Sequence, residues 1–119
     1  MIAWRGNTTY LQVCMDNTHD VTAVQFVIGI PRELKVETDA FRLTSRATDH
    51  VIQARRTKTD ETHDWYLVMA FSPTNSLFEG RTGKIIDIKF TMSEKAKEGS
   101  QLRPIITDAV MSNVKKENV

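Results

Sequence analysis

The side chains most capable of chemistry are three histidines, each of which stands directly beside an aspartate. The pairs are His19 with Asp20, His50 with Asp49, and His63 with Asp64. A carboxylate can orient an imidazole for catalysis or for metal binding. The pairs fall in or near predicted turns, however, and none has the spacing of a local metal site. We therefore expect structural histidines, with His50 partly buried and hydrogen-bonded at the start of a strand.

Two further candidates have equally simple structural explanations. Asp16, Asn17 and Asp20 could offer oxygen ligands to calcium, but they lack the EF-hand spacing and fit a polar turn. Cys14 is the one cysteine, so no intramolecular disulfide is possible. Its place in an alternating apolar segment favours a small packed side chain over a catalytic thiol.

Signatures of the common enzyme classes are missing from the chain. There is no G-x-S-x-G motif, no phosphate loop and no dinucleotide fingerprint. The segment 80–83 reads as a turn, since no helix is predicted after it. We expect no catalytic residue, no metal and no cofactor, and thus no enzyme.

Composition narrows the class further. The 119 residues carry 16 basic and 15 acidic side chains, a net charge of +1, which is unlike the one-sided field of a nucleic-acid binder. No apolar run reaches the roughly 20 residues of a membrane span. The length suits one domain over residues 1–119 with a two-layer core. The N-terminus lacks a signal-peptide pattern, so the chain reads either as cytosolic or as a mature or excised piece of an exported protein.

Apolar residues recur with a period of two, the spacing of β-strands. Four segments show it clearly: 10–15, 24–30, 65–71 and 84–92. Weaker strands are expected at 34–37, 41–45 and 50–56, and one turn of helix at 93–98. Short strands separated by polar turns predict an all-β, two-sheet antiparallel sandwich. Its predicted core is Leu11, Val13, Phe26, Ile28, Ile30, Leu67, Met69, Phe71, Ile86, Ile88 and Phe90.

The order of the segments resembles a known family. The chain reads as Val13–Asn17, Val21–Phe26, an apolar run to Pro31, Leu34–Val36, His50–Ile52, Trp65–Ser72, Phe78–Gly80, Gly83–Phe90, Glu98–Ser100 and Asp108–Ser112. This order, over about residues 8–113, resembles the cohesin-like modules of exported bacterial proteins. The resemblance implies a jelly-roll sandwich of roughly nine strands. It also implies an extracellular or cell-surface location and a dockerin-like protein partner bound on one flat sheet face.

A partner-binding face follows from combining this resemblance with the strand phases. The neighbouring strands 50–56 and 65–72 are expected to pair, since sequential strands usually do. The predicted outward set is Val51, Gln53 and Arg55 with Tyr66, Val68 and Ala70, and the predicted binding residues are Gln53, Arg55, Tyr66 and Val68. Tyr and Arg are enriched at interface hot spots. The open alternative is that a loop, or a neighbouring domain of the same protein, covers this surface.

Two other functions stay open at this point. The same fold family includes carbohydrate-binding modules, which would need two or more coplanar exposed aromatics or a bound calcium. A structural spacer would need neither, and its sheet faces should be uniformly charged. A docking module needs a flat face of mixed polar and apolar side chains.

Overall fold

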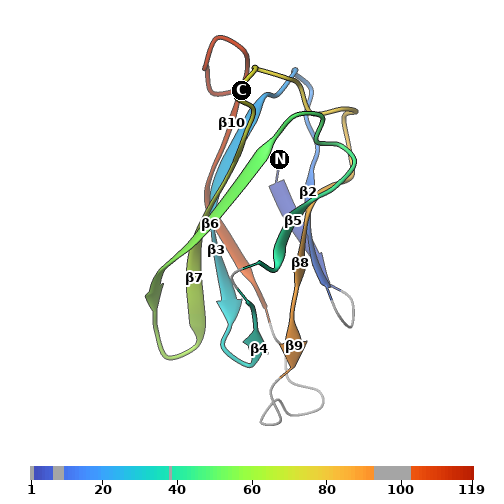
Figure 1. Ribbon diagram of the computed structural model, residues 1–119. Helices are drawn as coiled ribbons and strands as arrows, with labels where there is room; N and C mark the ends of the chain where they lie inside the picture. Colours follow the sequence, from blue (N-terminus) through green and yellow to red (C-terminus); the bar gives the residue numbers. More distant parts are fainter. Residues whose placement is uncertain (1, 7–9, 38, 93–102) are drawn as a thin grey trace.

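Two four-stranded antiparallel sheets pack against each other in the computed structural model, which describes residues 2–6, 10–37, 39–92 and 103–119 (Figure 1). The strands are β1 (Ile2–Gly6), β2 (Tyr10–Met15), β3 (Ala23–Pro31), β4 (Leu34–Lys35), β5 (Phe41–Leu43), β6 (Val51–Thr59), β7 (His63–Phe71), β8 (Lys84–Lys89), β9 (Thr91–Met92) and β10 (Ile105–Ser112). The described residues contain no helix, which confirms the predicted all-β sandwich.

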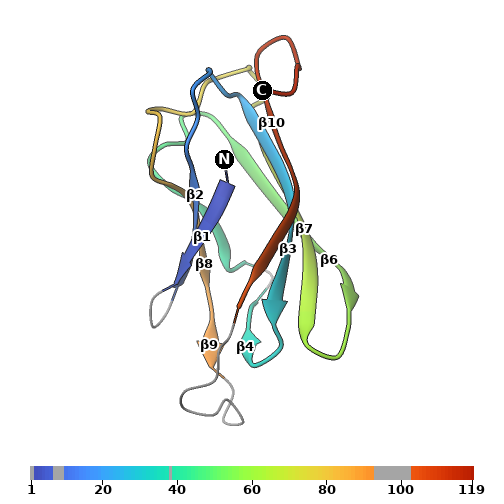
Figure 2. The same ribbon diagram turned by 180° about the vertical axis from the view of Figure 1, so that it is seen from behind.

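Each half of the chain contributes strands to both sheets. One sheet has the order β1-β2-β8-β5, and the other has the order β10-β3-β7-β6. The short strands β4 and β9 pair at one end of the molecule (Figures 1 and 2). The predicted pairing of strands β6 and β7 is present, with Gln53 opposite Met69 and Arg55 opposite Leu67.

Alternation builds the core between the sheets, because successive side chains of a strand point to opposite faces. On β2, Leu11 and Val13 are buried, and on β3 Phe26 and Ile28 are fully buried. Eight of the predicted core residues are buried: Leu11, Val13, Phe26, Ile28, Ile30, Ile86, Ile88 and Phe90. Inward-facing side chains from both sheets thus fill one interior.

The predicted phase of β7 was wrong. Val68 and Ala70 are fully buried, and Tyr66 packs at the edge of the core with its ring 5.3 Å from that of Phe41. Tyr66, Val68 and Ala70 therefore point inward and not outward. Leu67, Met69 and Phe71, which were predicted to be buried, lie half-buried on the opposite side of the strand. The register fixes this choice, since Phe26 stands opposite Val68 across the β3–β7 ladder.

One difference concerns the start of the chain. Strand β1 was not predicted, yet it pairs along β2 from Ile2 to Gly6, and Trp4 packs against the core. The predicted turn of helix at 93–98 lies outside the described residues. In the part of the chain that the structure describes, there is no helix long and apolar enough to cross a membrane.

Candidate docking surface

The outward side of the β10-β3-β7-β6 sheet is unusually rich in apolar side chains. Cross-strand pairing arranges the outward residues in rows. One row is Thr107, Val27, Leu67 and Arg55, the next is Val110, Gln25, Met69 and Gln53, and a third is Ile105, Gly29, Trp65 and Lys58. Phe71 stands opposite Val51 beside these rows. We call this set of outward side chains the apolar face.

Its apolar members are accessible to a partner. Val51 is 43% exposed and Ile105 is 40% exposed. Trp65, Leu67, Met69 and Phe71 are half-buried, as outward residues flanked by neighbouring strands should be. A solvated face of an antiparallel sheet normally carries polar residues, and a contiguous exposed apolar patch commonly marks an interaction site.

Trp65 lies over a glycine in the adjacent strand. A Cβ atom added at Gly29 would come within 2.8 Å of the Trp65 ring, so the ring rests directly on the backbone of β3. Any larger side chain at position 29 would push the indole off the sheet. The Lys58 ammonium lies 5.2 Å from the centre of the same ring, a cation–π distance.

Asp60, in the turn between β6 and β7, holds the polar edge of this indole. Its Oδ2 atom accepts a hydrogen bond from Trp65 Nε1 at 2.7 Å. Its Oδ1 atom accepts bonds from the backbone N–H groups of Thr62 at 2.9 Å and His63 at 2.7 Å. The bond from Trp65, followed by those from the Thr62 and His63 backbone, lowers the pKa of the Asp60 carboxyl well below its usual range. Asp60 is thus ionised at neutral pH, and its two oxygens hold the Trp65 ring and the backbone of the turn through hydrogen bonds.

The remaining charge on the apolar face is positive. Arg55 and Lys58 are exposed along the β6 edge, and neither forms an ion pair within the described residues. None of the outward residues in the three rows is acidic. A partner that covers this face therefore meets apolar side chains bordered by two cations.

The predicted binding residues divide between the two sides of the sheet. Gln53 and Arg55 are exposed on the apolar face, as expected. Val68 is fully buried and Tyr66 faces the core, so neither belongs to this surface. The sequence prediction missed this surface because it assigned Leu67, Met69 and Phe71, which share a phase of the strand with Trp65, to the core. A signal was available, since 65–71 is apolar on both phases of the strand and one apolar set had to face outward.

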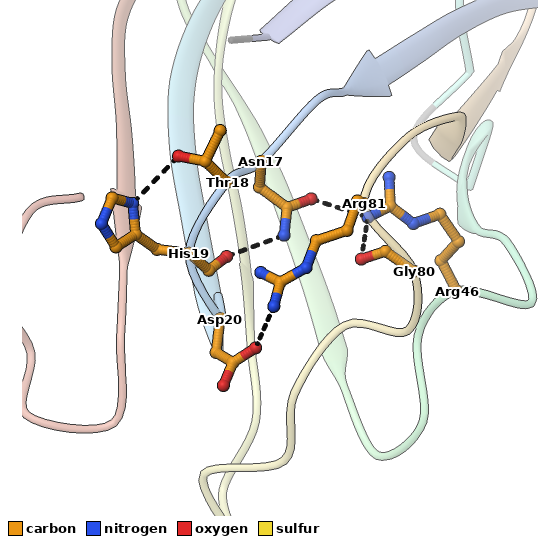
Figure 3. A network of polar contacts seen from close by, with 7 residues as sticks. All are labelled: Asn17, Thr18, His19, Asp20, Arg46, Gly80 and Arg81. Atoms are coloured by element: carbon orange, nitrogen blue, oxygen red, sulfur yellow. Dashed lines mark hydrogen bonds and ion pairs between the residues drawn. The ribbon is translucent and has the colours of Figure 1, made fainter.

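The opposite end of the sandwich holds a buried guanidinium that ties three loops together (Figure 3). All five N–H groups of Arg46 donate hydrogen bonds. The acceptors are the carbonyl oxygens of Met15, Glu79, Gly80 and Gly83 and the side-chain oxygen Oδ1 of Asn17, at 2.6–3.1 Å. Burial lowers the pKa of Arg46, although nearby Asp16 opposes the shift. All five of these acceptor oxygens bind the Arg46 guanidinium. This end of the molecule is therefore a structural junction between loops.

The candidate calcium ligands are engaged in this junction and its border. Asp16 accepts a hydrogen bond from the Thr82 hydroxyl. Asn17 accepts a hydrogen bond from Arg46, and Asp20 pairs with Arg81 at 3.0 Å (Figure 3). No group of three or more His, Cys, Asp or Glu side chains that could hold a metal is found in the described segments.

The histidines do not bond to their neighbouring aspartates. His50 is half-buried, stacks on Phe78 with ring centres 3.9 Å apart, and contacts the carbonyl oxygen of Thr22 at 3.0 Å. Burial lowers its pKa. This confirms the prediction of a satisfied, partly buried histidine. Asp49 instead accepts a hydrogen bond from Thr74, and Asp64 accepts one from Thr59.

A cleft of about 460 Å³ lies on the other sheet, near β4 and β9. Charged side chains of both signs line it, among them Lys35, Glu37 and Arg42. Tyr10, which is 37% exposed, and the buried Phe90 are its aromatic members. The cleft therefore lacks the pair of exposed aromatic rings expected of a sugar-stacking platform.

Comparisons with known proteins identify no relative of this chain. No family model matches the chain, and neither a curated protein nor a solved structure matches it.

Proposed function

We propose that the protein is a non-catalytic docking module, resembling cohesins, whose protein partner covers the apolar face. The proposal depends on four outward residues of β7, which are Trp65, Leu67, Met69 and Phe71. The inner face of the same sheet already packs against the core. Burying such side chains against a partner is favourable by about 25 cal/mol per Å² of apolar area. The sandwich needs none of them for its own interior.

The mixed character of the face separates docking from a spacer role. A spacer exposes uniformly charged sheets, whereas here apolar residues occupy the centre and polar Gln53 and Arg55 lie at the edge. Apolar centres with polar rims are typical of protein–protein interfaces. The resemblance adds that cohesins bind dockerin modules through one flat sheet face, so a dockerin-like module is the partner we propose. The setting implied by the resemblance is an exported or surface protein in polysaccharide degradation or adhesion.

A second copy of the chain is a poorer partner for this face. In a two-fold symmetric dimer the same patch occurs on both sides. Arg55 and Lys58 would then meet a surface whose outward rows offer them no carboxylate. Burying cations without partners is costly. Charge complementarity therefore favours a different protein.

The test uses a panel of purified dockerin modules and biolayer interferometry against the immobilised protein. We expect at least one module to bind the wild type and to be lost with Leu67→Asp. Gln12→Asp, on the outward side of the other sheet, is the matched control and should bind normally. Size-exclusion chromatography at several concentrations tests self-association in parallel. Binding by no module, equal binding by Leu67→Asp, or dimerisation through Leu67 would each refute the proposal.

A further inference from the structure

Trp65 differs from the rest of the apolar face because its position is fixed from three directions before any partner arrives. Gly29 provides the floor beneath the ring, Asp60 bonds its Nε1 atom, and Lys58 lies beside its π face. Leu67 and Met69 have no comparable polar restraint. An interface residue that is held in place before binding loses less conformational entropy when the partner docks.

The charges around this ring specify what can cover it. The Asp60 carboxylate accepts hydrogen bonds from Trp65 and from two backbone N–H groups, and among the described residues it forms no ion pair with Lys58 or Arg55. Lys58 stands opposite Trp65, and Arg55 stands opposite Leu67, on the same outward side of β6. Both lack an ion pair among the described residues. Carboxylates on an incoming segment would find two cations beside an apolar anchor.

We infer that Trp65 is the anchor of the docking surface, that Asp60 and Gly29 position its ring in advance, and that the partner segment covering it is apolar and flanked by carboxylates. This inference rests on the proposed docking function. It goes further by assigning a positioning role to Asp60 and a charge to the partner. Trp and Arg are the residue types that most often dominate binding energy at interfaces.

The positioning half is tested without a partner. The chain has two tryptophans, so Trp4→Phe leaves Trp65 as the only one. In that background, Asp60→Ala should shift Trp65 emission and increase its quenching by acrylamide. Asp49→Ala is the matched control, since this exposed aspartate also accepts a hydroxyl hydrogen bond, from Thr74, but does so away from Trp65. Unchanged emission and quenching in Asp60→Ala would refute the positioning role.

The recognition half uses three synthetic peptides that share one apolar stripe and carry flanks of Glu, Gln or Lys, with binding followed by fluorescence polarisation of a dye on the peptide. We expect the Glu-flanked peptide to bind most tightly and to lose at least about fivefold in affinity with Lys58→Glu and with Asp60→Ala. The Glu preference should shrink as salt is raised. Two outcomes would refute the inference while leaving docking intact. In the first, binding depends on Leu67 but shows no preference among the three flanks. In the second, binding depends on Leu67 but not on Asp60. No binding by any peptide would count against the face itself.

Discussion

Both sheets carry apolar residues on their inward sides, but their outward sides differ. On the β1-β2-β8-β5 sheet, one outward row runs Arg5, Gln12, Asp87 and Arg42. On the β10-β3-β7-β6 sheet, the corresponding row runs Thr107, Val27, Leu67 and Arg55. The first row is polar in all four strands, as a water-facing sheet normally is. The second has an apolar centre and one cation at its edge.

This difference separates what folding requires from what it does not. Either sheet supplies its share of the core through inward residues such as Leu11 and Phe26. The outward side of the first sheet shows that polar residues there are compatible with the fold. The interior therefore does not require apolar residues on the outward side of the second sheet, and this is the argument for the proposed interaction surface.

Neighbouring residues on β7 provide the sharpest test of the two sides. Val68→Asp would place a carboxylate in the core without a partner, and we expect it to prevent folding or to cost about 4 kcal/mol or more. Met69→Asp changes the outward side and should leave the melting temperature within a few degrees of the wild type. Thermal unfolding followed by circular dichroism compares the two. If Met69→Asp unfolds the protein and Val68→Asp does not, the phase described here is inverted.

The Arg46 junction should matter for stability and not for docking. Arg46→Met keeps the volume of the stem but removes all five hydrogen bonds, including those to Met15 and Asn17. Leaving buried acceptors unpaired should cost about 2–4 kcal/mol in the free energy of unfolding. Urea denaturation measures this loss, with exposed Arg42→Met as the control. A loss no larger than that of the control would contradict the structural role.

Docking should respond to the apolar face alone. Leu67→Ala and Trp65→Ala should each weaken partner binding by about 1–2 kcal/mol or more, and Leu67→Ala should barely change the melting temperature. Gln12→Ala, in the polar row of the other sheet, should change neither quantity. Interferometry against the dockerin module selected above gives the affinities. Equal losses from both sheets would show that the contrast between the faces has no functional meaning.

The smallest effect concerns the pH dependence of stability through His50. The Thr48 N–H donates to His50 Nδ1 at 3.2 Å, so the proton of the neutral ring is on Nε2, where it bonds the Thr22 carbonyl. Protonation would place a second hydrogen against the Thr48 N–H. Because the pKa is lowered in the folded state, stability should fall as pH drops below about 6.5, where the unfolded chain takes up the proton. Melting temperatures of wild type and His50→Gln between pH 5 and pH 8 check this, and parallel curves would argue against it.

Much of the fold could be predicted from local pattern. Period-two alternation located four strand regions clearly, three weaker strands were also expected where strands occur, and turn residues such as Pro31 marked where strands end. Strand β1 escaped prediction because Ile2–Gly6 is too short to show a pattern by itself. Its strand conformation depends on the ladder with β2, which is a tertiary contact.

The candidate site was half predictable. Gln53 and Arg55 were placed correctly because they are polar, whereas Ile52 and Ala54 on the other phase of β6 are apolar. Tyr66 and Val68 were placed on the wrong side because β7 is apolar on both phases, and the phase that carries Leu67, Met69 and Phe71 was assigned to the core. The position of Asp60 against Trp65 was not predicted, since a bond from a turn to a strand side chain leaves no periodic signal.

The sequence by itself determined the class of fold and the residues of β2, β3 and β8 that fill the core. It also placed apolar residues on both phases of one strand, β7. Which side of β7 entered the core was decided only by the tertiary structure. The ladder with β3 sets Val68 opposite Phe26 and Tyr66 opposite Ile28, and these inward pairs close the interior. A one-residue shift would exchange every side chain of the strand between core and solvent. Val68 and Ala70 therefore fill the interior beside Phe26, and Trp65, Leu67, Met69 and Phe71 lie on the outward side of the sheet.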